Sequence, residues 1–252
     1  MPTLTSIVRY PVKGLTADYL DHINVEKNRW LPLDRAWAIE NGGGVFDAQK
    51  PVHMKKKHFL MLAGQSALAG IECRFIEHEH KLRVTRKDEE PIEVFLDDPS
   101  TQGELFAHLE ALLGDDIRGS LRIIRAPDQA MTDIPEAQLS LINAATVRDI
   151  ASKTGLDISP DRFRGNLVID GFDAGAELDW VGRNIRIGAV EAKVEARIRR
   201  CAATSVNLKT AVPDTDMPAA LFEHYGHMDC GVYITVMNSD QITTGDPVEL
   251  SN

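Results

Sequence analysis

Residues 231–237 read Gly231-Val232-Tyr233-Ile234-Thr235-Val236-Met237 and carry the strongest strand signal in the chain. β-branched and aromatic side chains favour extended backbone, and a short apolar run is typical of a strand buried in a core. Residues 241–250 then predict a strand, a turn and a short closing strand. The C-terminal part of the chain is therefore expected to be a β structure.

Similar short segments recur toward the N-terminus. Residues 35–40 run into Asn41-Gly42-Gly43-Gly44, a hairpin signal after which residues 45–47 are expected to begin the return strand. Several short strands at close spacing favour a barrel or a sandwich over the alternating βα pattern of a doubly wound fold. The other predicted strands are residues 4–10, 22–26, 81–85, 92–96, 121–125, 166–171, 184–188 and 190–198.

Three segments are predicted to be helical. Residues 103–114 place their leucines on one face and end at Gly114, which suits a helix C-terminus. Residues 141–154 have Ser140 as a candidate N-cap and Gly155 as the stop, and residues 217–225 form a short helix. We therefore expect a mainly β, α+β fold with a boundary between its halves near residues 97–120.

The composition limits the function. The chain has 252 residues, of which 43% are hydrophobic, and its formal net charge of −10 disfavours binding to nucleic acid or anionic membranes. The N-terminus has no signal-peptide pattern, and no apolar run is long enough for a membrane span. Three cysteines without regular spacing argue for a reducing compartment. We expect a cytoplasmic protein that binds neither nucleic acid nor membrane.

Cys201 is the residue with the clearest chemical potential. It lies in Ile198-Arg199-Arg200-Cys201-Ala202-Ala203-Thr204-Ser205-Val206. Neighbouring cations favour a thiolate, which attacks electrophiles and binds soft metals, and the small residues that follow leave room for a ligand. Basic residues also cluster at Lys55-Lys56-Lys57, where a solvated surface is the usual explanation. A lone cysteine is more often a small buried hydrophobe, which is our interpretation of Cys73 and Cys230.

Other candidate sites have less support. The chain has no dinucleotide fingerprint, P-loop or nucleophile elbow. His78 and His80 would share one face of a strand, but a third ligand for a metal is missing. His224 and His227 flank Gly226 and either line a pocket or end a surface helix.

An ordered set of motifs surrounds Cys201 in the sequence. In this order the motifs resemble the MOSC proteins (molybdenum cofactor sulfurase C-terminal domain) preceded by the MOSC N-terminal β-barrel domain, and among them the amidoxime-reducing components. The motifs are Tyr10-Pro11-Val12-Lys13-Gly14, Leu33-Asp34-Arg35-Ala36-Trp37, Asp161-Arg162-Phe163-Arg164-Gly165-Asn166, Ala176-Glu177-Leu178-Asp179-Trp180, Asp229-Cys230-Gly231-Val232-Tyr233 and Thr244-Gly245-Asp246-Pro247-Val248.

The resemblance covers nearly the whole chain and implies a fold and a cofactor. The implied domains are an N-terminal β-barrel over residues 1–100, a helical connector over 101–118 and a MOSC mixed β-barrel over 119–252. The implied cofactor is the molybdenum cofactor, a molybdopterin whose metal is held by one cysteine, and Cys201 matches this metal ligand and catalytic position. Family-level descriptions also imply pyridoxal phosphate, although no lysine context here supports a Schiff base.

The resemblance also implies which residues surround the cofactor. Lys13, Arg35 and Arg164 match basic positions near the pterin phosphate, where Arg can grip bidentately. Asn166 can both donate and accept a hydrogen bond. The remaining implied contacts are Ser140, Arg200, Thr204 and Ser205, and helix capping is an alternative role for Ser140.

The chain departs from the amidoxime reducers at several positions. Gly14 replaces their usual Ser, Gly165 replaces Pro, and Asn207-Leu208 replaces Asp-Pro. These changes leave the metal ligand intact and leave the substrate open.

Two functions follow from these observations. One is a molybdenum-dependent oxidoreductase that removes oxygen from N-hydroxylated or similar small substrates, with electrons from a separate electron-donor protein. The alternative is a sulfur carrier that uses a Cys201 persulfide in cofactor or metal–sulfur cluster assembly. A binding module without catalysis would require Cys201 to be buried and inert. A common site predicts that Lys13, Arg35, Arg164 and Asn166 converge on Cys201.

Overall fold

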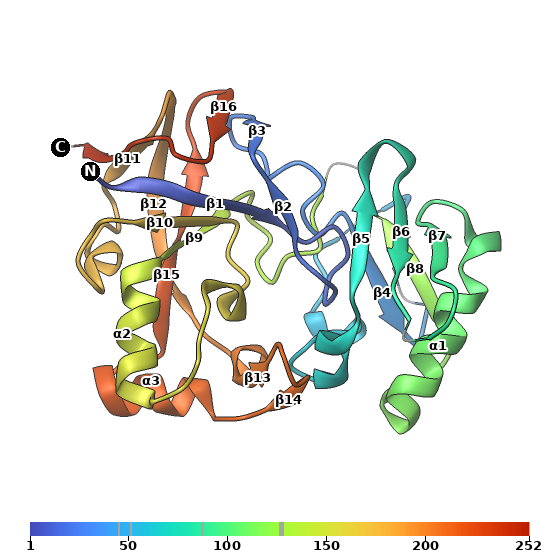
Figure 1. Ribbon diagram of the computed structural model, residues 1–252. Helices are drawn as coiled ribbons and strands as arrows, with labels where there is room; N and C mark the ends of the chain where they lie inside the picture. The colour runs from blue at the N-terminus through green and yellow to red at the C-terminus, as the bar shows by residue number, and fades with distance from the viewer. Residues whose placement is uncertain (45, 51, 87, 126–128, 252) are drawn as a thin grey trace.

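Strands from both ends of the chain share one eight-stranded sheet in the computed structural model, which describes residues 1–44, 46–50, 52–86, 88–125 and 129–251 (Figure 1). β9 and β10 run parallel, and the other neighbouring pairs are antiparallel. The strand order is β17 (Val248–Ser251), β11 (Asn184–Ile187), β12 (Val190–Arg199), β15 (Asp229–Val236), β9 (Leu139–Asn143), β10 (Leu167–Asp170), β1 (Thr3–Arg9) and β2 (Asp18–Leu20).

This sheet curls back on itself. The amide of Leu4 donates to the carbonyl of Asp246 at 2.9 Å, and the amide of Val248 donates to the carbonyl of Pro2 at 3.0 Å. These bonds join β1 to the segment that leads into β17, so the sheet forms a mixed barrel around an apolar core. The strand predicted at residues 231–237 supplies three buried side chains of that core, Val232, Ile234 and Val236. A smaller pair, β3 (His22–Val25) and β16 (Asp240–Thr243), lies beside it.

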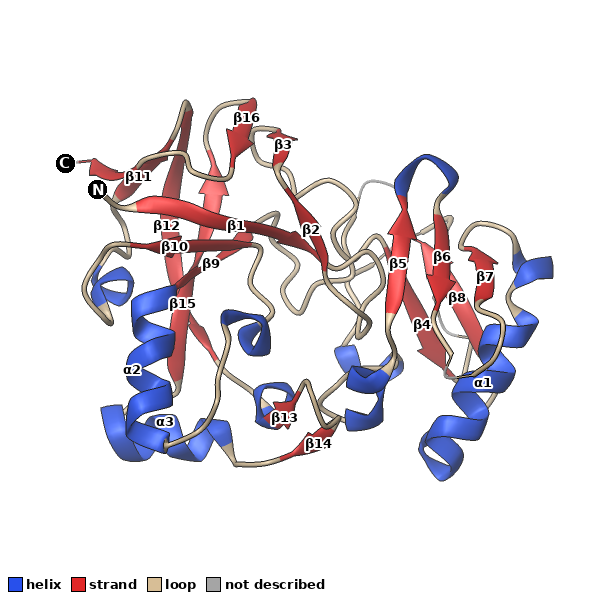
Figure 2. Ribbon diagram, viewed as in Figure 1, coloured by secondary structure: helices blue, strands red, loops and turns tan. Residues whose placement is uncertain are grey.

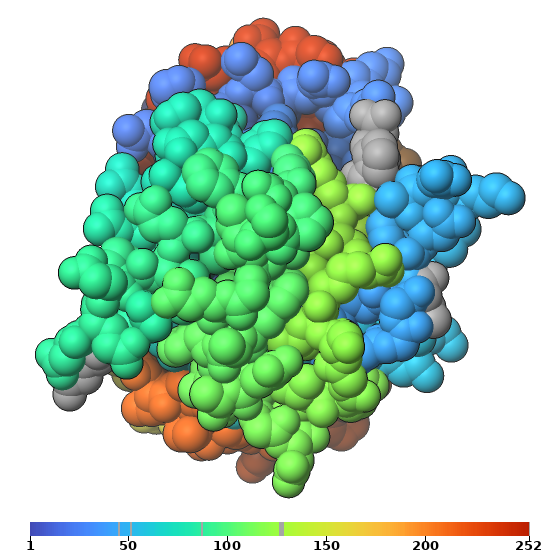
Figure 3. Space-filling model, turned by 90° about the vertical axis from the view of Figure 1, so that its right-hand side faces the viewer, coloured from blue at the N-terminus to red at the C-terminus, as the bar shows by residue number. Residues whose placement is uncertain are grey.

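The second body of the molecule is built from the middle of the chain (Figure 2). β4 (Trp37–Asn41) pairs with β8 (Leu121–Arg125), and β5 (Cys73–Ile76), β6 (Lys81–Val84) and β7 (Ile92–Phe95) form an antiparallel sheet. α1 (Gly103–Leu113) buries Leu105 and Leu109 in the core that these strands enclose. Figure 3 faces this body, whose surface is built mainly by the residues coloured teal to green.

Each half of the sequence contributes a strand that pairs with strands of the other half. β1 belongs to the barrel of the C-terminal half, while β8 pairs with β4 of the N-terminal half. The predicted boundaries at residues 100 and 118 stay a prediction. No helix among the described residues is long and apolar enough to cross a membrane.

The helix predictions are confirmed for residues 103–114 and 217–225, which form α1 and α3 (Met217–Tyr225). The prediction of Ser140 as an N-cap is wrong. α2 (Ala144–Thr154) begins after Asn143, whose side-chain oxygen accepts a hydrogen bond from the amide of Ala145 at 3.0 Å. Ser140 lies instead inside β9, which is buried between β15 and β10.

The predicted hairpin after residue 41 is also wrong. β4 pairs with the distant β8, and a Cβ on Gly42 would lie 3.0 Å from the backbone of Arg118. Phe46 is buried with its amide bonded to Oε1 of Glu40, so residues 46 and 47 form no strand, and Val45 lies outside the described residues. Gly42 therefore allows a close approach of two backbone segments.

Short 3-10 turns and one small hairpin complete the chain. His78 lies in such a turn, between Glu77 and Glu79, and His80 follows it with Nδ1 2.7 Å from Oδ2 of Asp97. The hairpin is β13 (Val206–Asn207) with β14 (Val212–Pro213). The turns are η1 (Lys56–His58), η2 (Ser66–Gly70), η3 (Glu77–Glu79), η4 (Pro99–Thr101), η5 (Gly114–Asp116), η6 (Pro160–Phe163), η7 (Ala176–Asp179) and η8 (Ala202–Ser205).

Candidate functional site

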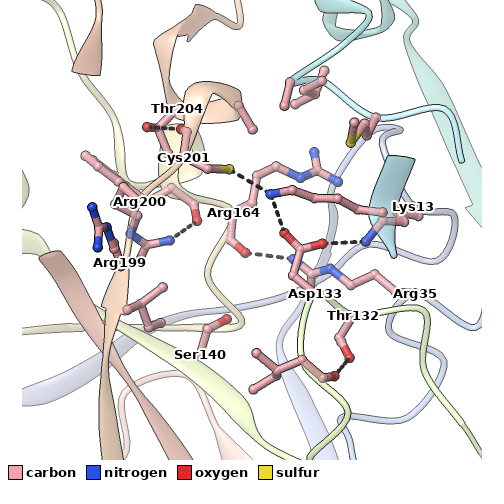
Figure 4. A pocket seen from close by; sticks show the side chains of 18 of the residues that line it. Lys13, Arg35, Thr132, Asp133, Ser140, Arg164, Arg199, Arg200, Cys201 and Thr204 are labelled. Carbon is pink, nitrogen blue, oxygen red and sulfur yellow. Dashed lines mark hydrogen bonds and ion pairs between the residues drawn. The ribbon is translucent and has the colours of Figure 1, made fainter. Parts of the chain in front are cut away.

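One cavity gathers most of the residues that the sequence analysis singled out, although they come from distant parts of the chain (Figure 4). Its wall includes Leu62, which belongs to the core enclosed by β4 to β8 and α1, and Phe163 of the C-terminal half. The predicted residues that line it are Lys13, Arg35, Ser140, Arg164, Asn166, Arg200, Cys201 and Thr204. Ser205 is not among the lining residues, because its hydroxyl accepts a hydrogen bond from the amide of Met217 at 3.1 Å, at the start of α3.

Cys201 lies two residues after the end of β12 and is half-buried, while Cys230 lies in the core. The cation at the sulfur is Lys56, whose Nζ donates to Sγ of Cys201 at 3.2 Å. The neighbouring Arg199 instead directs Nη2 to the sulfur of Met228 at 3.5 Å. The thiol therefore faces the cavity with an ammonium group beside it.

Arg200 supports the wall of the cavity through the main chain. Its Nε donates to the carbonyl of Cys230 at 2.7 Å, and its Nη1 donates to the carbonyl of Phe163 at 2.9 Å. Burial lowers the pKa of this guanidinium. Because its donors are engaged with carbonyls, Arg200 holds neighbouring backbone segments in place and has little left to offer a ligand.

The turn after Cys201 is fixed from two sides. The amide and the hydroxyl of Thr204 both donate to the carbonyl of Cys201, at 3.0 and 2.8 Å. The buried Arg162 donates to the carbonyls of Thr204 at 2.6 Å and Ser205 at 2.9 Å, and it also pairs with Asp214. Arg162 was not predicted as a site residue, although it stands two residues before Arg164 in the same motif.

A carboxylate bridges two lysines next to the sulfur. Oδ1 of Asp133 lies 2.7 Å from Nζ of Lys13, and Oδ2 lies 3.2 Å from Nζ of Lys56. Burial opposes the charged form of Asp133, but the two ammonium groups outweigh it and hold the pKa of this carboxyl well below its usual range. Burial lowers the pKa of Lys13, and Asp133 offsets part of that effect.

Lys56 and Asp133 were not predicted as site residues. The run Lys55-Lys56-Lys57 was the only signal for Lys56, and Asp133 had none. For Lys56, burial and the attraction of Asp133 act in opposite directions, and the net effect raises the pKa of the ammonium. Lys56 therefore remains a cation at the sulfur.

Arg35 and Arg164 sandwich the ring of Tyr10. Their Cζ atoms lie 4.7 and 4.0 Å from its centroid, and Nη2 of Arg35 donates to the carbonyl of Arg164 at 2.9 Å. Both arginines have left-handed backbone, with φ of 48° and 51°, which costs about 1–2 kcal/mol for each residue that is not glycine. The surrounding structure therefore holds both arginines in a conformation that they would not adopt by themselves.

One hydrogen-bond donor of Arg164 has no partner among the described residues. Its Nη1 donates to the carbonyl of Leu15 at 3.0 Å, whereas Nη2 is buried and has no hydrogen-bond partner among the described residues. Burial lowers the pKa of Arg164 to about 10. An unpaired buried cation is costly, so this position suits an anionic ligand.

Ser140 and Asn166 bond mainly to each other. Oδ1 of Asn166 accepts from the hydroxyl of Ser140 at 2.8 Å, and the amide of Asn166 donates to that hydroxyl at 3.0 Å. Nδ2 of Asn166 donates to the carbonyl of Val8 at 3.2 Å. The pair thus joins β9 and β10 to β1 behind the cavity.

The donor set fits a metal-bearing anionic cofactor. No cluster of three or more His, Cys, Asp or Glu side chains suited to a metal occurs in the described part of the chain, so a metal at Cys201 needs further ligands from a cofactor. A half-buried thiol provides one soft ligand. Lys13, Lys56, Arg35 and Arg164 outnumber the carboxylates Asp34 and Asp133, which leaves positive charge for an anionic group.

Known proteins resemble this chain along its length. Residues 1–114 match the family model of the MOSC N-terminal beta barrel domain, and residues 122–249 match that of the MOSC domain. A molybdenum cofactor sulfurase of Drosophila grimshawi is 35% identical over 133 residues, which cover 49% of this chain and 17% of that protein. The molybdenum cofactor sulfurase of Drosophila willistoni is 26% identical over 257 residues, which cover 93% of this chain and 31% of that protein. The chain thus spans less than a third of these curated relatives.

A solved structure shares the fold. The YUAD protein from Bacillus subtilis superposes with a TM-score of 0.50 at 13% sequence identity, over 99% of this chain and 96% of that one. At this identity the likeness concerns the fold alone. Because the two family models together account for almost the whole chain, the protein belongs to the MOSC family, with a MOSC N-terminal beta barrel domain and a relationship to molybdenum cofactor sulfurase.

Proposed function

We propose that the protein binds a molybdenum cofactor through Cys201 and acts as an oxidoreductase on N-hydroxylated or related small substrates. The observation that supports this most is the convergence of Lys13, Arg35 and Arg164 with Cys201 on one cavity. These residues lie in three stretches that are far apart in the sequence, so packing alone gives no reason for them to meet.

The residues of the cavity would hold such a cofactor in three ways: as a metal ligand, as cations near its anionic group and as support for the backbone. Cys201 would supply the protein ligand to the metal, and the unpaired Nη2 of Arg164 would donate to an anionic group of the pterin. Arg35 and Lys13 add positive charge nearby, while Arg162 and Thr204 keep the backbone at Cys201 in place. When bound, the cofactor supplies two-electron redox chemistry.

The reaction we propose is a reductive removal of oxygen. The N–O bond of the substrate breaks, two electrons arrive from a separate electron-donor protein, and two protons are taken up. The products are the N–H compound and water. Pyridoxal phosphate stays a prediction of the family resemblance, and we propose no step that uses it.

Metal analysis tests the proposal. Protein made in a host that synthesises the cofactor should contain stoichiometric molybdenum, and Cys201→Ala should lose it. Cys73→Ala is the matched control, because Cys73 packs against the N-terminal core and should leave the metal content unchanged. The proposal fails if the wild-type protein carries no molybdenum or if Cys201→Ala carries as much.

A second candidate function is sulfur transfer through a Cys201 persulfide. The ammonium of Lys56, 3.2 Å from the sulfur, would neutralise a persulfide anion equally well. The terminal sulfur would then pass to an acceptor, and Cys201 would return to the thiolate. Mass spectrometry after incubation with a sulfur donor should show one labile added sulfur on Cys201 without metal; a chain that stays unmodified contradicts this role.

A further inference from the structure

Groups of alternating charge lead from Lys13 to the sulfur of Cys201. Nζ of Lys56 lies 3.2 Å from Sγ of Cys201 and 3.2 Å from Oδ2 of Asp133. The other carboxylate oxygen of Asp133 lies 2.7 Å from Nζ of Lys13. Figure 4 shows the dashed lines that connect the sulfur, the ammonium groups and the carboxylate in sequence. An oxyanion is therefore already held beside the sulfur, and the chain itself supplies it.

The two lysines differ in their freedom. Lys13 has a side chain that is 9% exposed, and its Nζ is also tied to the carbonyl of Met131 at 2.8 Å. The side chain of Lys56 is 36% exposed, and both of its partners face the cavity. Lys56 is thus the cation that an incoming molecule meets first at the sulfur, and Asp133 is the group that such a molecule must displace or share.

We infer that Lys56 makes the site select for anionic molecules, namely small compounds that carry a carboxylate or another oxyanion close to their reacting group. Cationic molecules, including an amidinium product, would be repelled at the same place. This inference deepens the proposed function, on which it rests, by naming the charge class of the substrate.

The selection can be measured on the cofactor-free protein with two alkylating reagents that differ only in charge. Iodoacetate is an anion and iodoacetamide is neutral. In both reactions the sulfur of Cys201 forms a bond to the CH2 carbon, the C–I bond breaks, iodide leaves with the electron pair, and the thiol proton goes to solvent. The same thiolate attacks both reagents, so the ratio of the two rates is independent of the thiolate fraction. Peptide mass spectrometry separates Cys201 from Cys73 and Cys230.

The ratio of the iodoacetate rate to the iodoacetamide rate should be higher for Cys201 of the wild-type protein than for N-acetylcysteine. The difference should become smaller with added salt, because salt screens the attraction between charges. Lys56→Met should lower the ratio about fivefold, since one unit charge near the reagent is removed. Lys56→Arg should keep most of it, and Asp133→Asn should raise it. Lys57→Met is the matched control: it removes the same charge from an exposed neighbour and should leave the ratio unchanged.

The outcomes are separable from those of the proposed function. A wild-type ratio no higher than that of N-acetylcysteine overturns the inference, even if the variants fold poorly. An unchanged ratio in Lys56→Met, or an equal loss in Lys57→Met, overturns it as well. None of these results depends on molybdenum, and a wild-type protein without molybdenum would refute the oxidoreductase while leaving the ratio as it is.

Discussion

Arg162 offers the sharpest test of how the backbone at Cys201 is held. Its side chain is 4% exposed, and it donates to the carbonyls of Thr204 at 2.6 Å and Ser205 at 2.9 Å while pairing with Asp214. Replacing it with leucine, Arg162→Leu, keeps an apolar stem but leaves two carbonyls and one carboxylate without their cation. Each hydrogen bond from a charged donor contributes about 1.5–3 kcal/mol.

The expected loss of stability is about 3–5 kcal/mol, because two hydrogen bonds from a charged donor to main-chain carbonyls are lost, while the partly exposed carboxylate of Asp214 is solvated by water. For a chain of this length that corresponds to a fall in Tm of roughly 6–20 °C. Arg162→Lys should recover part of the loss, because one ammonium cannot reach all the acceptors that a guanidinium fork serves. Differential scanning calorimetry on the cofactor-free protein measures both changes.

Arg148→Leu is the matched control. Arg148 also pairs with an aspartate, Asp170, through two bonds of 2.7 and 2.8 Å, but its side chain is 63% exposed. An exposed pair contributes about 0.2–1 kcal/mol, so its loss should change Tm by at most about 4 °C. If Arg162→Leu lowers Tm no more than Arg148→Leu does, the turn after Cys201 is not held in the way we argue.

Three further predictions follow from other parts of the site. Arg164→Met should leave the Tm of the cofactor-free chain within about 3 °C, because an unpaired buried charge is removed, yet it should reduce molybdenum content about tenfold; retained molybdenum would count against a cofactor contact. Gly165→Ala should lower the free energy of unfolding by about 1–3 kcal/mol, since its Cβ would lie 2.3 Å from Cγ1 of Ile142. Adding Ile142→Ala should restore part of that stability. Chemical denaturation of the single and double variants measures this, and losses that simply add would contradict the prediction. Burial raises the pKa of Glu177. The contribution of this carboxyl group to stability is therefore present below its usual pKa and is lost as the pH rises through its pKa in the folded protein. Glu177→Gln should flatten the Tm–pH profile above pH about 4.5, and an unchanged profile would contradict this.

Local patterns predicted the elements well where one segment carries its own signal. The apolar run at residues 231–237 is a buried strand, and the leucine face of residues 103–114 packs into the core enclosed by β4 to β8. Prediction failed where a distant partner decides the structure. Gly42 turns toward the backbone of Arg118, and Ser140 lies in a strand because β15 and β10 flank it. No local pattern contains those partners.

The same reasoning explains what was found and missed at the site. Cys201, Arg35 and Arg164 stand in motifs that are recognisable in sequence, and all three line the cavity. Lys56 stands 145 residues before the cysteine whose sulfur it contacts, in a run of lysines typical of any solvated surface. Asp133 is recognisable only once Lys13 and Lys56 are seen on either side of it. Their role depends on how the loops pack.

The cations of the cavity divide into two groups, and the division bears on function. Arg162 and Arg200 direct their donors to main-chain carbonyls, so they stabilise the walls whether or not a ligand is present. Arg164 keeps a buried donor without a partner among the described residues, on a backbone with φ of 51°. Arg164 also contacts Tyr10 and the carbonyl of Leu15, but neither contact satisfies the buried Nη2, and both the strained backbone and the unsatisfied donor cost folding free energy. The most direct physical reason for such a group to persist beside Cys201 is an anionic ligand that satisfies it.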